Sequence, residues 1–266
     1  MNGRPALVTF LIVVVFGLCG PASASVCDLT TDGASCGPAL YNDAIFKEIS
    51  PQPTGTGYVD PFLRLQDNGH EEGYNTDARP FQSGMDQKDP INYTHDVRLG
   101  SVPVKTINGV DYREFFLDIN ESNSAANHLL SLDELRIYLS PTGSLNSYNA
   151  GNNKLNGLNA IYDLDAGPGD NWIDLNYSLN HGSGSGDMVA YIPNSLFSGP
   201  DSQFVYLFSR FGDQQAADGD ADAGFEEWWL GPTQRTIAAV PEPGSLLLLG
   251  AGLGALGRAF HKRKKS

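Results

Sequence analysis

Short runs of alternating apolar and polar residues, separated by turn residues, constrain the fold of this chain more than any other feature. The clearest run is VKTINGVDYREFFLDI, in which Asn108-Gly109 separates two β-rich stretches. An Asn-Gly pair in this setting is the strongest short signal for a β-hairpin, because both residues accept positive φ. After the pair, Phe115, Leu117 and Ile119 occupy alternate positions, which predicts one buried strand face.

Further runs of the same form predict a set of short strands. They are LSLDELRIYLS, NWIDLNYSL, MVAYIP and QFVYLFSRFG, and Gly-, Asn- and Pro-rich turns separate them. No amphipathic helix of about ten residues stands out, and 194–197 has the composition of a single helical turn. This pattern is typical of an antiparallel β-sandwich or a jelly roll. The fold class that we expect is therefore mainly β.

Composition divides the chain into segments with different expected roles. We expect a signal peptide at 1–24, an irregular disulfide-tied segment at 25–57, a β-sandwich ectodomain at 58–237, a linker with Pro-Glu-Pro at 238–243, a transmembrane helix at 244–260 and a basic cytoplasmic tail at 261–266. Within the ectodomain, the polar stretches 149–160 and 180–188 are expected to be mobile loops.

The N-terminal segment has the order of a secretory signal peptide. Arg4 precedes an apolar stretch from Ala6 to Cys19, and Ala22-Ser23-Ala24 is a small-x-small cleavage pattern. We expect cleavage after Ala24, and the alternative is an uncleaved N-terminal anchor. Cleavage would leave the mature chain in a compartment that permits disulfides.

The cysteines support the same compartment. Of Cys19, Cys27 and Cys36, the first leaves with the signal peptide, and the other two remain as an even pair. In an oxidising compartment this predicts a disulfide between Cys27 and Cys36 that closes a small loop. A metal site there is disfavoured, because no histidine lies close by in the sequence.

The chain is acidic, with a formal net charge of −14 at pH 7. Nucleic acid is therefore not an expected partner, because its phosphates would be repelled. A solvated acidic surface and the binding of divalent cations are the two explanations that the sequence leaves open.

The C-terminal segment, VPEPGSLLLLGAGLGALGRAFHKRKKS, joins a short apolar run to a basic cluster. No charged residue lies between Gly244 and Gly257, and the run is shorter than the roughly 20 residues of an ordinary span. Only a helix satisfies the backbone inside a bilayer, and positive charge stays on the cytoplasmic side. We therefore expect a membrane helix that leaves the ectodomain outside.

This segment resembles the PEP-CTERM sorting signal, found in Gram-negative bacteria that make extracellular polysaccharide. The residues that carry the resemblance are Pro241, Glu242, Pro243, Arg258, Lys262, Arg263, Lys264 and Lys265. The resemblance implies processing by an exosortase, a membrane-embedded cysteine protease or transpeptidase, and a protein that is released or anchored at the surface. A plain tail anchor would give the same topology without processing. More loosely, the body resembles the uncharacterised ectodomains that accompany this signal, which implies no particular activity.

One acidic loop, DGDADAGFEEW, is the candidate metal site. It places Asp218, Asp220 and Asp222 at alternate positions, with Glu226 close behind, and carboxylates at that spacing suit Ca²⁺. An EF-hand would need Gly at its sixth and Glu at its twelfth position, and neither is present. A looser calcium loop and a solvated acidic loop both remain open.

One other acidic loop and one acidic residue at the end of a strand are further candidates for a metal site. The loop YDLDAGPGDNW contains Asp163, Asp165 and Asp170. Asp118, at the end of an expected strand, could add a metal ligand or could cap a turn.

The aromatic pair Trp228 and Trp229 is the candidate glycan-binding site, because an indole face can stack on a sugar ring. The same residues are what a last sandwich strand would bury. No nucleophile elbow, zinc pattern or phosphate loop is present in the sequence. Carboxylates for glycoside hydrolysis cannot be paired from sequence. We therefore expect no catalytic residues.

The sequence thus predicts a secreted, surface-sorted, non-catalytic protein of the extracellular matrix or biofilm, with a structural, adhesive or polysaccharide-binding role. The expected partners are an exosortase, the membrane before processing, and extracellular polysaccharide. No cofactor is certain, and Ca²⁺ is the candidate. The alternatives are a surface glycan-active hydrolase, which would need two close carboxylates, and a simple tail-anchored envelope protein.

Overall fold

The computed structural model describes residues 24–50, 59–122, 124, 127–166, 169–182, 184–213, 220–221 and 224–231. These residues form two seven-stranded sheets, a small two-stranded sheet and four short 3₁₀ turns, with no α-helix in the described part. The mainly β fold class is therefore confirmed. None of the described helices is long and apolar enough to cross a membrane. The apolar stretch of the expected signal peptide and the expected transmembrane helix at 244–260 lie outside the described residues.

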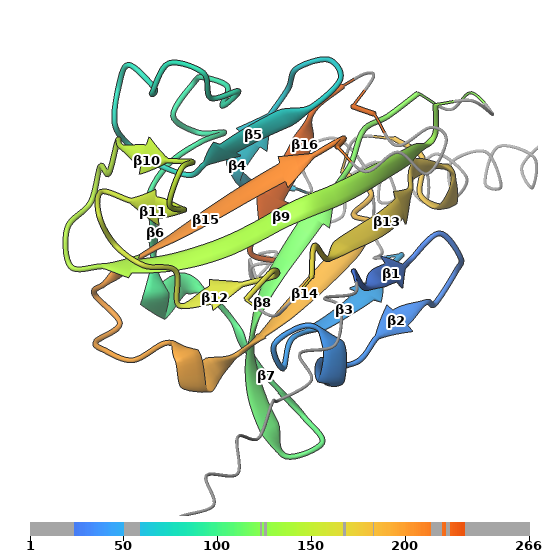
Figure 1. Cartoon of the computed structure of the whole chain (residues 1–266), viewed down its shortest axis with the longest axis horizontal. Helices are drawn as coiled ribbons and strands as arrows, with labels where there is room; N and C mark the ends of the chain where they lie inside the picture. Colours follow the sequence, from blue (N-terminus) through green and yellow to red (C-terminus); the bar gives the residue numbers. More distant parts are fainter. Residues whose placement is uncertain are drawn as a thin grey trace, which may run out of the picture.

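The first large sheet, sheet A, lies at the front in Figure 1. Its order is β1-β13-β9-β15-β5, with β12 on β9 and β6 on β15. The strands are β1 (Val26–Asp28), β5 (Glu71–Tyr74), β6 (Val97–Arg98), β9 (Leu129–Ser140), β12 (Tyr162–Asp163), β13 (Trp172–Asn176) and β15 (Phe204–Phe211). All pairs are antiparallel except β1 with β13, which is parallel.

The second large sheet, sheet B, lies behind it, in the order β2-β3-β14-β8-β16-β4 with β7 on β8. The strands are β2 (Ser35–Cys36), β3 (Ile45–Glu48), β4 (Pro61–Leu65), β7 (Val104–Ile107), β8 (Val110–Asp118), β14 (Met188–Pro193) and β16 (Glu226–Trp229). All its pairs are antiparallel.

One hydrophobic core joins the facing sides of the two sheets. It contains the expected alternate residues Phe115, Leu117 and Ile119, each 0% exposed, together with apolar side chains of β9, β13 and β15. A hydrogen bond of 2.9 Å from Trp228 Nε1 to Ser209 Oγ crosses from sheet B to sheet A inside this core. The strand pattern predicted the apolar face, and the second sheet covers it because exposed apolar area is unfavourable in water.

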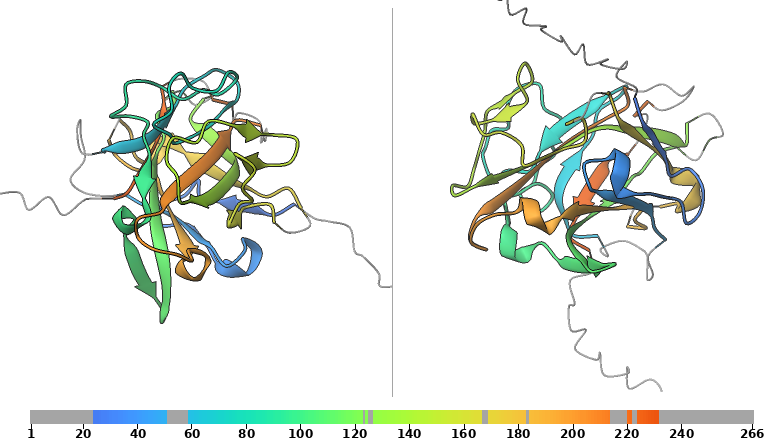
Figure 2. Two further views of the ribbon diagram at one scale, coloured as in Figure 1. Left: turned by 90° about the vertical axis from the view of Figure 1, so that its left-hand side faces the viewer. Right: turned by 60° about the horizontal axis from the view of Figure 1, so that its bottom comes forward.

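The predicted hairpin is present as β7 and β8. Its turn residues Asn108 and Gly109 have φ of 51° and 82°, the left-handed geometry that a two-residue hairpin turn requires. The hairpin extends beyond the rest of the body (Figures 1 and 2). The single turn expected near 194–197 is also present, as the 3₁₀ turn η4 (Asn194–Leu196).

The segment 25–57, expected to be irregular, differs from that expectation where it is described. Its strand β1 pairs with β13 of sheet A, and its strand β3 pairs with β14 of sheet B. The disulfide between Cys27 and Cys36 joins β1 to β2 and so links the two sheets at one edge. Short strands at a sheet edge carry too few residues for a periodic pattern, so the sequence did not reveal them.

The polar stretch 149–160, expected to be a loop, is also partly ordered. It contributes to the small sheet of β10 (Tyr148–Asn149) and β11 (Lys154–Leu155). The side chains of Tyr148 and Leu155 pack over the outer face of sheet A, where they form a second, smaller core with aromatic side chains of β9 and β15. One half of that outer face is therefore covered and apolar.

Candidate functional site

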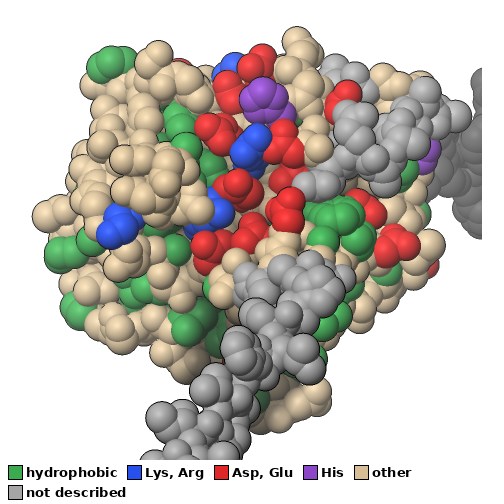
Figure 3. Space-filling model, in the orientation of Figure 1, with side chains coloured by type: hydrophobic (Ala, Val, Ile, Leu, Met, Phe, Trp, Pro, Cys, Tyr) green, Lys and Arg blue, Asp and Glu red, His purple; other side chains and the backbone are tan. Residues whose placement is uncertain are grey.

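The other half of the outer face of sheet A is open and charged. In β9 and β15, the residues that point away from the main core include Glu134, Arg136 and Arg210, and the strand register sets Arg210 opposite both Glu134 and Glu72. We call the charged band the set Glu72, Glu134, Arg136, Asp163, Arg210 and Asp213. Figure 3 shows acidic and basic side chains gathered across the middle of this face. Cross-strand neighbours of opposite charge attract one another, so the band is built into the sheet.

Arg136 is the centre of one half of the charged band. Its Nε lies 3.0 Å from Asp163 Oδ2, its Nη1 pairs with Glu134, and the same nitrogen donates to Tyr148 Oη at 3.2 Å. The Arg136 side chain is only 4% exposed, while Glu134 and Asp163 are 23% and 25% exposed. Burial alone lowers the pKa of Arg136, but Asp163 and Glu134 outweigh it and raise that pKa above its ordinary value. The guanidinium therefore stays charged and holds two carboxylates that solvent can still reach.

Arg210 is the centre of the other half. Its guanidinium lies 3.9 Å from Glu72, 3.5 Å from Glu134, and pairs with Asp213 three residues later. All four side chains are between 21% and 32% exposed. Glu134 is thus shared by both arginines, which joins the two halves into one network across β5, β15 and β9.

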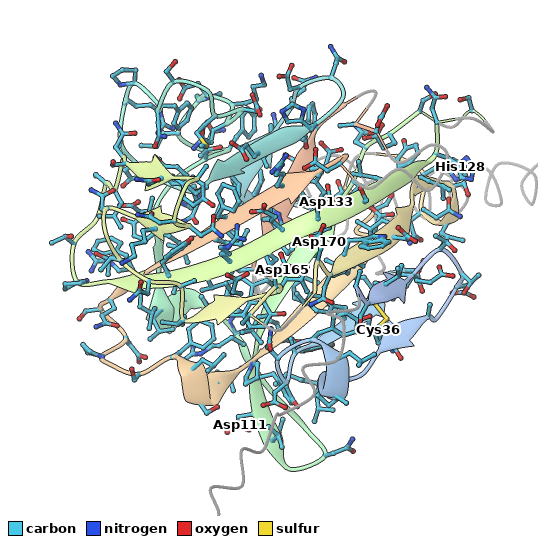
Figure 4. All side chains as sticks on the ribbon, in the orientation of Figure 1. Cys36, Asp111, His128, Asp133, Asp165 and Asp170 are labelled. Carbon is cyan, nitrogen blue, oxygen red and sulfur yellow. A yellow bond between two sulfur atoms is a disulfide. The ribbon has the colours of Figure 1, made fainter. Side chains whose placement is uncertain are left out.

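Asp165 and Asp170 extend the acidic surface below β9. Figure 4 labels Asp165 and Asp170 next to each other beside this strand, and their charges interact. Burial raises the pKa of Asp165 to about 6, and the nearby Asp163 and Asp170 add to the rise. The backbone N–H of Asn171 donates to Asp165 Oδ1 at 2.7 Å, and this hydrogen bond lowers the pKa and offsets part of the rise. This carboxyl therefore changes its charge about two pH units above an ordinary aspartate.

Aromatic side chains form a rigid wall beside the charged band. The ring of Tyr148 stacks on Phe208 with centroids 4.2 Å apart, and Tyr74 lies next to Tyr148 at 6.4 Å. These rings are at most 6% exposed. They therefore fix the position of the Tyr148 hydroxyl, and they do not offer a ring face to a ligand.

The expected calcium residues are not assembled in the described part of the chain. Asp218 and Asp222 lie outside the described residues. Asp220 lies beside Ala221, whose backbone pairs with Gly69, and Glu226 is buried inside the body. Among the residues that the structure describes, no three acidic, histidine or cysteine side chains are placed to hold a metal ion. Calcium binding by this loop stays a prediction.

The candidate glycan-binding residues lie in the interior. Trp228 is 0% exposed and Trp229 is 1% exposed, and the ring of Trp229 packs on Phe116 at 4.9 Å between centroids. These positions match the alternative that the sequence left open, in which a last strand buries both residues. The partly exposed Phe225 is covered on one side by the Arg64 guanidinium, at 4.1 Å.

Asp118 anchors a loop instead of joining a metal site. Its carboxylate accepts the backbone N–H groups of Gly184, Ser185 and Gly186 at 2.8, 3.0 and 2.6 Å. The Gly-Ser-rich loop before β14 is therefore held at the end of β8. Burial raises the pKa of Asp118, and the three N–H donors offset part of the rise.

Sequence reasoning missed the charged band and a group of buried acids. The buried acids are Glu48, Glu71, Asp118, Glu121, Asp133, Asp187, Glu226 and Glu227. Some have clear partners, such as the pair of Glu227 Oε1 with Arg64 Nε at 2.7 Å. The acidic composition suggested a solvated surface. Arg136 and Arg210 lie on the polar side of their strands, and this was the one signal in the sequence that nearby carboxylates could be paired with arginines.

The expected sorting signal, Pro241 to Pro243 with the basic cluster at Arg258 and 262–265, lies outside the described residues. The comparison with protein families identifies it independently: residues 239–264 match the PEP-CTERM protein-sorting motif. No curated protein matches the chain, and no solved structure matches it. The match covers the C-terminal segment alone, so it indicates how the protein is sorted and not what the body of the chain does. The chain therefore carries a PEP-CTERM protein-sorting motif, the mark of exosortase-processed proteins that are sorted to the surface of Gram-negative bacteria.

Proposed function

We propose that this chain is a non-catalytic protein of the extracellular matrix, whose jelly-roll-like body binds polysaccharide through the charged band. The observation that supports the proposal is the network around Glu134, in which Arg136 and Arg210 hold carboxylates in place on an open sheet face. Sugar hydroxyls are bound by fixed donors and acceptors, and charged groups make the stronger hydrogen bonds. Because the groups are held before a ligand arrives, little side-chain entropy is lost on binding.

The charge of the band favours one class of sugar. Four carboxylates, from Glu72, Glu134, Asp163 and Asp213, face two guanidinium groups. This excess of negative charge repels uronic acids and favours neutral or amino sugars. The ligand that we propose is therefore a neutral or amino-sugar polysaccharide of the matrix in which the protein is sorted.

The test is size-exclusion chromatography of the polysaccharide of the native host with the purified full chain. We expect the protein to move into the polysaccharide peak, and the Arg210→Gln and Glu134→Gln variants to stay at their own elution volume. Asp111→Asn is the matched control, since Asp111 is an exposed acid that bonds to Thr106 in the hairpin of β7 and β8. Comparable binding by all the variants would contradict the assignment of the band.

A surface glycan-active hydrolase is the second candidate, and Asp165 is the observation that favours it. A carboxyl with a pKa of about 6 beside Asp163 has the character of a general acid next to a second carboxylate. A hydrolase would shorten the polysaccharide in the same experiment, and the Asp165→Asn variant would leave it intact. Polysaccharide of unchanged size supports the non-catalytic proposal.

A simple tail-anchored envelope protein is the third candidate. It predicts that the C-terminal segment stays on the protein in its native host, whereas exosortase processing removes it. The intact mass of protein isolated from that host separates the two.

A further inference from the structure

Two buried glutamates from different sheets meet at one end of the body. Glu71 is the first residue of β5 in sheet A, and Glu226 is the first residue of β16 in sheet B. Each is 1% exposed. Their carboxyl groups lie within hydrogen-bonding reach of each other. A contact between two carboxyl groups thus bridges the two sheets in the interior.

The surroundings of the pair supply few donors. Asp67 N–H donates to Glu71 Oε2 at 2.9 Å, and Asn120 N–H lies 3.5 Å from Glu226 Oε1. Glu71 Oε1 is buried and receives no N–H or O–H donor from the residues that the structure describes. An acceptor oxygen in that position needs a proton, because an unsatisfied buried carboxylate is costly.

The charged neighbours of the pair are mostly acidic. Asp86 and Lys88 face Glu71, and Glu121 faces Glu226 from the segment after β8. Arg64 of β4, which runs beside β16, is already paired with Glu227. Among the residues that the structure describes, Lys88 is the cation that acts on Glu71, and it does not act on Glu226.

Two ionised carboxylates cannot share such a site without strong repulsion. Burial raises the pKa of Glu71 above its ordinary value, and burial together with Glu71 and Glu121 raises the pKa of Glu226 well above its ordinary value. A raised folded-state pKa means that the pair stabilises the fold at pH values below the unfolded pKa, near 4.5. That contribution is lost as the pH rises through the raised pKa values.

We propose that the Glu71–Glu226 pair is a pH-sensitive latch between the two sheets, closed by a shared proton and opened when both carboxyl groups ionise. The strand that it holds, β16, is the last strand described before the sorting motif at 239–264. Opening the latch removes a contact of β16 and of β5, because each strand carries one of the two carboxylates. The two carboxylates of the latch do not belong to the charged band, which lies on the outer face of sheet A.

The indole rings of β16 report the state of the latch. Trp228 and Trp229 follow Glu226 directly and are buried, and Trp172 is the remaining tryptophan of the chain. In a full-length Trp172→Phe chain in mild detergent, all tryptophan emission therefore comes from β16. We expect this emission to shift reversibly to longer wavelength as the pH is raised from about 5 to about 9, across the range where raised carboxyl pKa values fall.

Two variants in the Trp172→Phe background test the cause of the shift. Glu226→Gln and Glu71→Gln each replace one carboxyl with an amide that donates a hydrogen bond at every pH, so the shift should disappear in both. The exposed Asp111→Asn variant removes one acidic charge elsewhere and should keep the shift. If one glutamine variant does not fold, the other still decides the question.

Three results would overturn the latch. One is emission that does not change with pH in the parent chain, and the second is a shift that persists in the glutamine variants. The third is a shift that disappears when a chelator is added, since its pH dependence would then come from a bound cation and not from a shared proton.

Discussion

Breaking the disulfide between Cys27 and Cys36 should destabilise the whole body, because it links strands of different sheets. Cys27 belongs to β1 in sheet A, Cys36 belongs to β2 in sheet B, and Cys27 is fully buried. The two residues are nine apart, so the closed loop has about ten residues. Loop-closure entropy for that length gives roughly 2.7 kcal/mol at 25 °C. For a body of this size, that corresponds to a fall in Tm of roughly 5–11 °C.

The assay is thermal unfolding followed by far-UV circular dichroism, with and without a reductant that carries no thiol. Reduced protein should unfold at the lower temperature, and a Cys27→Ala/Cys36→Ala variant should unfold there under both conditions. The free energy of unfolding should fall slightly more in the variant than in the reduced protein, because the variant also lacks the sulfur atoms that fill the core. A change below about 1 kcal/mol in the free energy of unfolding would refute the reasoning, since the β1 and β2 pairings would then hold the edge without help.

Other predictions follow from single groups. Asp118→Ala leaves three buried N–H groups without an acceptor and should lower the free energy of unfolding by about 3 kcal/mol in urea titrations, whereas Asp118→Asn should cost less. The raised pKa of Asp165, about 6, means that its contribution to stability is present below pH 3.8 and is lost as the pH rises through 6. Asp165→Asn should therefore raise the Tm at pH 7 and leave it nearly unchanged at pH 4, with a gain of about 1 kcal/mol after solvent screening. If the acidic loop at 218–222 binds calcium, chelation should lower the Tm, because a ligand of the native state stabilises it. Processing by an exosortase predicts that protein from its native host lacks Arg258 to Ser266, which its intact mass would reveal.

Features set by neighbouring residues could be predicted from the sequence. The Asn108-Gly109 hairpin depends on two residues that accept positive φ, and both have it. The disulfide depends on two cysteines that lie close together in the sequence, and the structure pairs them. In each case the partners are close along the chain, so local geometry and composition were sufficient.

Features that join distant residues could not be predicted in the same way. Arg136 alternates with apolar residues in LSLDELRIYLS, a pattern that favours an exposed polar side chain. In the structure its side chain is buried and contacts Glu134, Asp163 and Tyr148. Its partner Asp163 comes from the short strand β12, which has no periodic pattern. The contact between Glu71 and Glu226 joins residues more widely separated still, and composition alone favoured a solvated position for both. A strand buried on both faces, as β16 is, shows no alternation that would reveal it.

The position of β16 has a consequence for the order of folding and sorting. This strand lies between β8 and β4 inside sheet B, and all four of its residues are buried. Sheet B is therefore incomplete until Trp229 has joined it. From Trp229 to Pro241 the chain can span at most ~40 Å when fully extended. The sorting motif begins at residue 239, so the strand that completes the fold lies only a short stretch of chain before the segment that an exosortase processes. Because β16 precedes the sorting motif in the chain, an enzyme that processes the motif acts on a chain that already contains this strand. The processed segment then lies within ~40 Å of Trp229.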